Sequence, residues 1–245
     1  MMRWARLTWQ VPDPAAFAPG LAERLGVVAR PGGGLVPDAW TVDLGAAWLE
    51  LRPWMRESPA DHPRPGGRLV LEPVTGGEPA PEDADASNDG THESEARSMR
   101  LVGLGWATVE LDRAAEELGM WLGDRPERSD GTDPLLGAYA RVFAAGGLPG
   151  DAVVLLEPST EGRVSASLAR DAEGPTALYL RPAAGLGPWL RAARTRGVRV
   201  GPRRLGPLGS SVIVADGPIS GPHLVIVDAP GPRRSGRAGA GTIGP

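Results

Sequence analysis

Short apolar runs recur three times along the chain and end in similar ways. Residues 68–75 read RLVLEPVT, residues 153–160 read VVLLEPST, and residues 224–230 form a weaker third copy, LVIVDAP. Each copy is typical of a buried strand closed by an acid and a proline, because proline cannot continue a hydrogen-bonded ladder. This self-similarity predicts three repeated units.

An opening strand and a helix precede each closing strand. In the first unit, residues 7–11 lead into a helical pattern over residues 14–25, and Gly26 supplies a C-terminal stop. In the second unit Asp112 is the expected N-cap of the helix. The expected opening strands and helices of the other two units cover residues 104–109 and 112–122, and residues 176–180 and 186–196, with a further short strand at 198–200.

This pattern divides the chain into three βαβββ-like modules, over residues 1–75, 98–160 and 161–232. Residues 76–97 are acidic, with small or polar neighbours, and are expected to form a disordered linker. Residues 233–245 are rich in Gly and Arg and are expected to form a disordered tail. The short junction between the second and third modules predicts that these two pair with each other. The first module would then pair with its copy in a second chain, as a homodimer, or pack on the free edge of the others.

Three short motifs carry a resemblance to a known family: RTRGV at 194–198, GPLGS at 206–210 and SLARDAEG at 167–174. With the repeated βαβββ unit, they resemble the vicinal oxygen chelate superfamily, which includes glyoxalases, methylmalonyl-CoA epimerases, extradiol dioxygenases and bleomycin-resistance proteins. The resemblance implies an α+β, glyoxalase-like fold in which curved, antiparallel or mixed sheets carry helices on their outer face.

The resemblance also implies where a divalent metal would be held, and the residues there are not metal ligands. The family's His positions would fall near Arg6, at Leu104 or Gly105, and at Thr176 or Ala177; its carboxylates would fall at Leu69, Val154 and Val225. A divalent cation requires N or O donors, which aliphatic side chains lack. We therefore expect no metal and no other cofactor.

The acids that end the three repeats do not restore that site. They lie an odd number of residues from the implied carboxylate positions, so a strand would place them on its opposite face. We expect them to end their strands in solvent; they are Glu72, Glu157 and Asp228.

Composition narrows the chemistry further. Of 245 residues, 41% are apolar, which is enough for a sizeable core, and eight Trp against two Tyr and two Phe predict that buried rings are mostly indoles. The chain has no Cys, and each of its 26 basic residues is Arg, which excludes disulfides, thiolate catalysis and lysine Schiff bases. A net charge of −4 gives no pull toward nucleic acid, and no apolar run has the length of a membrane span. We expect a cytoplasmic protein.

Two residues are candidate acid–base groups. Glu50 alternates with Leu49 and Leu51, so it lies either on a cleft wall or on the exposed face of a strand. His223 begins the last strand and titrates near neutral pH, but a His at a strand edge is also often structural.

Four further residues are candidate ligand-binding groups. Trp9, Trp106 and Tyr179 occupy matching places in the opening strands, where they would stack on a flat ligand or pack in the core. Arg199 belongs to a basic run over residues 191–204, which is typical of phosphate, coenzyme A or nucleic-acid binding, and equally of a solvated helix face.

The interpretation favoured by these patterns is a metal-free, glyoxalase-like module that binds a small organic molecule in a cleft lined by Trp and Leu. A lyase, isomerase or dioxygenase-like enzyme acting on a small oxygenated or acyl substrate is the alternative, with Glu50 or His223 as its acid–base group. A third alternative is an Arg-dependent factor that binds nucleic acid or protein. The identity of the ligand does not follow from the sequence.

Overall fold

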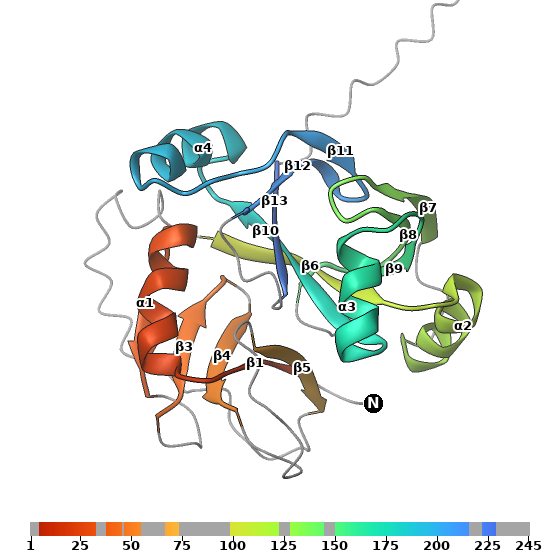
Figure 1. The fold of residues 1–245 in the computed structure, drawn as a ribbon, viewed down its shortest axis with the longest axis horizontal. Helices are drawn as coiled ribbons and strands as arrows, with labels where there is room; N and C mark the ends of the chain where they lie inside the picture. Colours follow the sequence, from red (N-terminus) through yellow and green to blue (C-terminus); the bar gives the residue numbers. More distant parts are fainter. Residues whose placement is uncertain are drawn as a thin grey trace, which may run out of the picture.

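The computed structural model describes residues 5–32, 38–45, 47–54, 67–73, 99–122, 128–144, 150–215 and 222–228. Within this part of the chain, two sheets and the helices packed on them form a layered α+β fold (Figure 1). The predicted linker at 76–97 and tail at 233–245 lie outside the described residues.

Two βαβββ modules form the larger, eight-stranded sheet. One comprises β6 (Met99–Ala107), α2 (Leu111–Leu122), β7 (Arg128–Asp133), β8 (Ala138–Ala144) and β9 (Ala152–Pro158). The other comprises β10 (Gly174–Pro182), α4 (Leu186–Thr195), β11 (Arg204–Gly206), β12 (Gly209–Ile213) and β13 (His223–Val227). In each, the closing strand runs parallel to the opening strand, and the two modules join where β6 and β10 pair antiparallel. The predicted glyoxalase-like fold class is confirmed.

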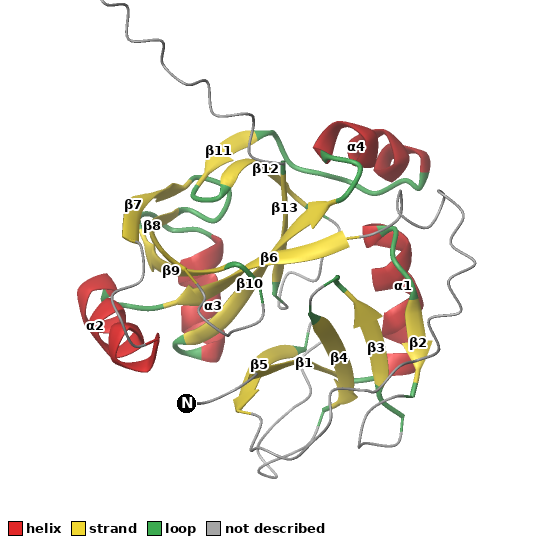
Figure 2. Ribbon diagram, turned by 180° about the vertical axis from the view of Figure 1, so that it is seen from behind, coloured by secondary structure: helices red, strands yellow, loops and turns green. Residues whose placement is uncertain are grey.

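The smaller sheet has five strands and belongs to the N-terminal part of the chain. Its elements are β1 (Ala5–Val11), α1 (Pro14–Leu25), β2 (Ala29–Pro31), β3 (Trp40–Asp43), β4 (Trp48–Pro53) and β5 (Arg68–Pro73), and the strand order is β2-β3-β4-β1-β5 (Figure 2). The N-cap Asp13, whose side chain accepts the backbone N–H of Ala16, starts α1, and Gly26 ends it in the left-handed conformation.

The strand that closes the first module is β4, not the segment that the sequence repeat indicated. β4 runs parallel to β1, whereas β5 pairs antiparallel with the other edge of β1. β5 thus takes the place beside β1 that β10 takes beside β6. The expectation that residues 68–75 close the first module was wrong, because an apolar run ending in Glu-Pro marks the end of a buried strand but says nothing of its neighbour's direction.

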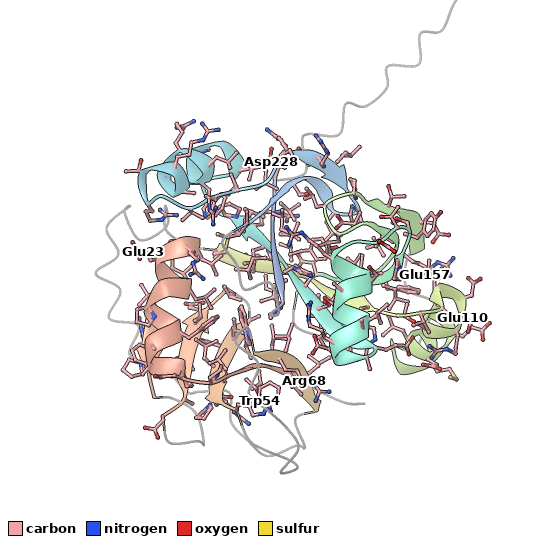
Figure 3. All side chains as sticks on the ribbon, in the orientation of Figure 1. Glu23, Trp54, Arg68, Glu110, Glu157 and Asp228 are labelled. Atoms are coloured by element: carbon pink, nitrogen blue, oxygen red, sulfur yellow. The ribbon has the colours of Figure 1, made fainter. Side chains whose placement is uncertain are left out.

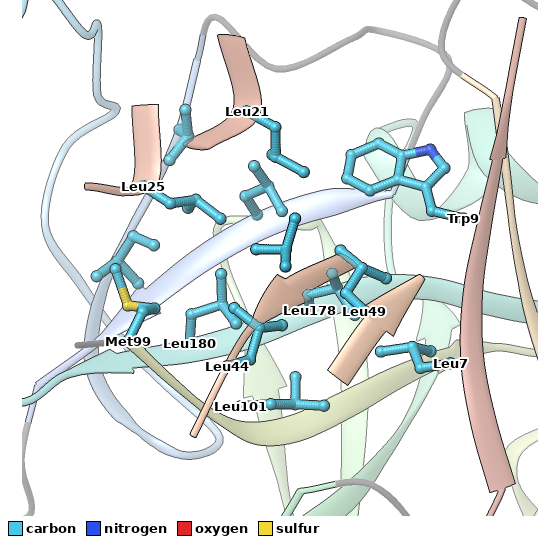
Figure 4. Close-up of a cluster of buried hydrophobic side chains, with 14 of the residues drawn as sticks. Leu7, Trp9, Leu21, Leu25, Leu44, Leu49, Met99, Leu101, Leu178 and Leu180 are labelled. Carbon is cyan, nitrogen blue, oxygen red and sulfur yellow. The ribbon is translucent and has the colours of Figure 1, made fainter. Parts of the chain in front are cut away.

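One hydrophobic core joins the two sheets. Leu7 and Trp9 on β1 and Leu21 and Leu25 on α1 belong to the same cluster as side chains from β6, β10 and α4 (Figure 4). The indole N–H of Trp189 on α4 also donates to the carbonyl oxygen of Leu25, at 3.0 Å. The N-terminal module is therefore packed on the outer face of the eight-stranded sheet rather than joined to its edge.

The opposite face of the eight-stranded sheet, called here the inner face, is filled. Alternate residues of β9 divide between the two faces: Val153 and Leu155 pack with α2, while Val154 and Leu156 pack on the inner face. The sheet curls until its edge strands β7 and β11 touch. A further helix, α3 (Arg163–Asp171), packs on the inner face between the modules.

The sequence did not predict α3, because residues 167–174 resembled a family junction. The signal was available, however, in the apolar residues Val164 and Leu168 at four-residue spacing, both of which belong to the inner-face cluster. A helix of nine residues leaves only two turns of pattern, which is easily read as a loop.

Gly105 tests how tightly the inner face is packed. A Cβ added there would lie 2.7 Å from the Cβ of Ala177 and 3.1 Å from Cδ1 of Leu156. We expect Gly105→Ala to lower the free energy of unfolding by about 1–3 kcal/mol through overpacking. A Cβ added at Gly131, on β7, would meet no atom within 4 Å, so Gly131→Ala is the matched control and should change stability by less than about 0.5 kcal/mol. Equal urea midpoints for the two variants would contradict a filled inner face.

Candidate functional site

The inner face is where a glyoxalase-like fold would hold a divalent metal, and its residues do not fit one. Gly105, Val154, Ala177 and Val225 are buried, and none carries a donor atom in its side chain. Within the described ranges, no group of three or more His, Asp and Glu side chains could hold a metal ion. We therefore derive no chemistry through a metal at this position.

Tyr179 occupies the inner face and is held there by a buried carboxylate. Its hydroxyl donates to Oδ2 of Asp133 at 2.7 Å, and Oδ1 of Asp133 accepts the backbone N–H groups of Leu135 and Leu136, at 2.9 and 3.2 Å. Burial raises the pKa of Asp133 despite these bonds, and also raises the pKa of Tyr179. Of the two uses expected for Tyr179, stacking on a ligand or packing in the core, the structure shows the ring packed in the core.

The acids that end β9 and β13 bind helix N-termini. Oε2 of Glu157 accepts the backbone N–H of Leu111 at 2.7 Å, and Oδ1 of Asp228 accepts that of Leu186 at 3.4 Å. Each acid thus satisfies an unpaired donor at the start of its own module's helix. Both acids were expected to end their strands in solvent. They are half-buried and also bind the helix starts. The assignment of Asp112 as N-cap was wrong, since Asp112 lies in the first turn of α2.

A pocket of about 210 Å³ lies between β5 and the segment that leads from α3 into β10. Figure 3 shows Arg68, one of its lining residues, on β5. Both apolar and polar side chains line the pocket. They include Leu69, Leu71, Trp106, Ser167, Asp171 and Thr176. The pocket therefore combines an apolar wall with hydrogen-bonding groups, as ligand sites do.

Ser167 and His223 meet beside this pocket. Ser167 lines it, and its Oγ lies 3.3 Å from Nε2 of His223, which is 5% exposed. Burial lowers the pKa of His223 to about 4, and the positive charges of Arg163 and Arg170 act in the same direction. A hydrogen bond with the backbone of Arg163 opposes that shift. The imidazole is thus neutral at neutral pH.

A second acid of the pocket, Glu173, is a fixed anion. It accepts hydrogen bonds from the Thr108 hydroxyl and the Val109 backbone N–H, both at 2.7 Å, and from Arg113 at 2.6 and 2.8 Å. These bonds lower the pKa of Glu173 to about 2. Sequence reasoning missed Ser167 and Glu173, because their positions depend on α3, which was not predicted.

Glu50 lies on the other sheet, away from His223. As the alternation with Leu49 and Leu51 predicted, it is on the opposite face of β4 from the apolar core, where it is 5% exposed and forms an ion pair with Arg52 at 2.9 Å. The hydroxyl of Thr8, which faces Glu50 across the parallel pair, is buried without a hydrogen-bond partner. The structure does not bring the two candidate acid–base residues together.

The remaining candidates divide between core and surface. Trp9 is fully buried, and its ring contacts that of Phe17 edge-on, with centroids 4.9 Å apart. Trp106 is the one candidate ring that lines the pocket. Arg199 is exposed after the end of α4. Two other arginines of the same basic run make contacts within the fold: Arg203 forms an ion pair with Asp228, and Arg196 donates to the carbonyl oxygen of Arg24.

The chain is similar to several solved structures. No family model matches the chain, and no curated protein matches it. Among solved structures, it is similar to methylmalonyl-CoA epimerase from Mycobacterium tuberculosis, with 22% identity, a TM-score of 0.45, and coverage of 53% of this chain and 88% of that chain. It is also similar to a variant of the Streptomyces coelicolor methylmalonyl-CoA epimerase in complex with 2-nitronate-propionyl-CoA, with 23% identity, a TM-score of 0.43, and coverage of 53% and 98%.

A third similar structure is a hypothetical protein from Bacillus halodurans, with 14% identity, a TM-score of 0.43, and coverage of 54% of this chain and 96% of that chain. Each of these similarities covers about half of this chain, whose described residues contain the paired βαβββ modules that the resemblance in the sequence implied. None of the helices in the described ranges has the length and apolar character needed to cross a membrane.

The hydrogen bond between Tyr179 and Asp133 predicts a loss of stability in Tyr179→Phe. The variant leaves Oδ2 of a buried carboxylate without its donor, so we expect the free energy of unfolding to fall by about 1–3 kcal/mol. The control is Tyr139→Phe, at a ring that is 51% exposed, which should be close to neutral. A calorimetric comparison in which both variants melt alike would show that the bond contributes nothing.

His223 predicts a loss of stability in mild acid. Its pKa in the folded protein, about 4, is below the ordinary 6.5, so folding favours the neutral ring. The contribution is fully present above pH 6.5 and is lost as the pH falls toward 4, by about 3 kcal/mol in total. His223→Gln should lose this dependence. Unfolding titrations at about pH 7.5 and about pH 4.5, on either side of the ordinary His pKa, check it; an unchanged pH dependence in the variant would rule out His223 as the source.

Proposed function

We propose that this protein binds a small organic molecule in the pocket between β5 and the segment from α3 to β10. The observation that carries the proposal is that Trp106, Leu69 and Leu71 line the same 210 Å³ pocket as Ser167 and Asp171. An apolar wall excludes water from one side of a ligand, while a few polar groups fix its orientation. The proposed site differs from the expected cleft, because it lies at the seam between the two sheets and outside the inner face.

The inner face itself is not the binding site in this proposal. Tyr179 and Leu208 occupy it: a Cβ added at Gly103 would lie 2.6 Å from Cδ1 of Leu208. α3 packs over the same face. A ligand there would have to displace a buried core, which would cost several kcal/mol.

The size and charge of the pocket restrict the ligand. Its volume is below the roughly 300–1,000 Å³ of sites for drug-sized molecules, so the ligand has about the size of one substituted ring. Asp171 and Glu173 line it together with Arg68, and Arg113 pairs with Glu173, so Asp171 is the acid on which the charge preference depends. Carboxylates accept hydrogen bonds and attract positive charge. We infer a small cationic or hydroxylated molecule with an apolar face that contacts Trp106.

Three probes of one shape test this inference. Benzylamine, benzyl alcohol and benzoate share a ring but differ in charge, and we expect ligand-observed NMR to rank their affinity in that order, because the pocket's acids attract the ammonium and repel the carboxylate. Strongest binding by benzoate, or no binding by any of the three, would contradict the proposed ligand chemistry.

Trp106→Ala tests the apolar wall. We expect it to weaken benzylamine binding about tenfold or more, since a buried aromatic contact contributes more than about 1 kcal/mol. Trp48→Ala is the matched control, because Trp48 is 42% exposed on β4 and is not among the residues that line the pocket. Affinity unchanged in folded Trp106→Ala, or reduced equally in the control, would place the site elsewhere.

A further inference from the structure

Ser167 and His223 form the arrangement of a nucleophile and its base at the pocket wall. We propose that Ser167 is a nucleophile, with His223 as its general base, in the transfer of an acyl group from a small ester to water. This inference rests on the proposed function, because it places the ester in the same pocket. It goes further in assigning a covalent reaction to that site.

The geometry supports proton transfer from the hydroxyl to the ring. Oγ of Ser167 lies 3.3 Å from Nε2 of His223, close to the reach of a nucleophile and its base before substrate binds. The backbone of Arg163 raises the pKa of His223, which is the direction expected when a ring N–H donates to a carbonyl oxygen. When Nδ1 carries that proton, Nε2 accepts from Ser167.

The surroundings keep the base in its active form. Burial and the charges of Arg163 and Arg170 hold the ring neutral, so Nε2 has a free electron pair at neutral pH. The same arginines oppose formation of the imidazolium, so proton transfer is uphill and turnover should be slow. Ser167 itself is 3% exposed, yet it lines the pocket, so a ligand must enter the pocket to reach Oγ.

The reaction balances with water as the only co-reactant. Oγ of Ser167 bonds to the ester carbonyl carbon while its proton passes to Nε2 of His223. The bond from that carbon to the alkoxy oxygen then breaks, and the alcohol leaves with the proton from the imidazolium. Water, losing a proton to Nε2, attacks the acyl-serine, and Oγ recovers a proton as the carboxylic acid is released.

Two probes test the assignment on the full chain. 4-Nitrophenyl acetate should release one nitrophenolate per chain in a burst, followed by slow turnover, and diisopropyl fluorophosphate should leave a single adduct that peptide mass spectrometry places on Ser167. Ser167→Ala should abolish both signals. His223→Gln should slow the burst at least tenfold while the fold, followed by circular dichroism, is retained.

Ser165→Ala is the matched control, because Ser165 lies on the same helix but hydrogen-bonds to the backbone of Gly162 and does not line the pocket. It should keep the wild-type burst. Adduct mapping in the unaltered protein keeps the test decisive if a variant fails to fold. An adduct on another residue, or no adduct, overturns the inference.

The two proposals fail separately. Benzylamine binding that depends on Trp106, without any acylation of Ser167, overturns the inference and leaves the proposed function intact. Acylation of Ser167 in a protein that does not bind benzylamine overturns the proposed ligand chemistry and supports the nucleophile.

Discussion

The hydrogen bond from Tyr179 to Asp133 holds the Tyr179 ring on the inner face of the eight-stranded sheet, so that this face is filled and forms no cleft. It ties β10 of one module to the end of β7 of the other, across an inner face that would otherwise be concave. A buried carboxylate is costly unless it is hydrogen-bonded, so the Tyr hydroxyl and the two backbone N–H groups that Asp133 accepts are needed together. With the ring in place, α3 completes a core where a cleft could have been.

Because the inner face is filled, the candidate binding pocket lies instead between the two sheets. β5 occupies the edge of β1 that a complete partner module would use, and its residues form one wall of the pocket. The other wall comes from α3 and the start of β10, the segment that also packs the inner face. The same helix therefore covers the inner face and, through Ser167, lines the pocket between the two sheets.

A repeated electrostatic device positions the helices of the two paired modules. The acid at the end of each closing strand accepts a backbone N–H at the start of that module's helix, at Leu111 and at Leu186. The acid lies three residues, an odd number, after the inner-face position that the resemblance assigned to a metal ligand. It therefore lies on the helix side of the sheet, where it can bind the helix N-terminus but not an inner-face metal. The first module uses a different device, the local N-cap Asp13.

The sequence by itself determined the elements whose pattern is local. The apolar strands, the α1 and α4 helices and the repeated strand–helix unit follow from periodicity, because each depends on a few neighbouring residues. The alternation that set Glu50 on the face opposite Leu49 is of the same kind. The resemblance to a known family, and not periodicity, singled out Gly105, Val154, Ala177 and Val225, whose identities alone exclude side-chain donors.

Only the tertiary structure decided which strands are neighbours and which polar residues meet. β5 looks like a closing strand but pairs antiparallel, since the direction of a neighbour leaves no trace in an apolar run. Ser167 and His223 are 56 positions apart, and their contact depends on a two-turn helix with little pattern of its own. Local propensity acts over a turn or a strand, whereas a site assembled across sheets is set by long-range packing, so the pocket could not be predicted from the residues that line it.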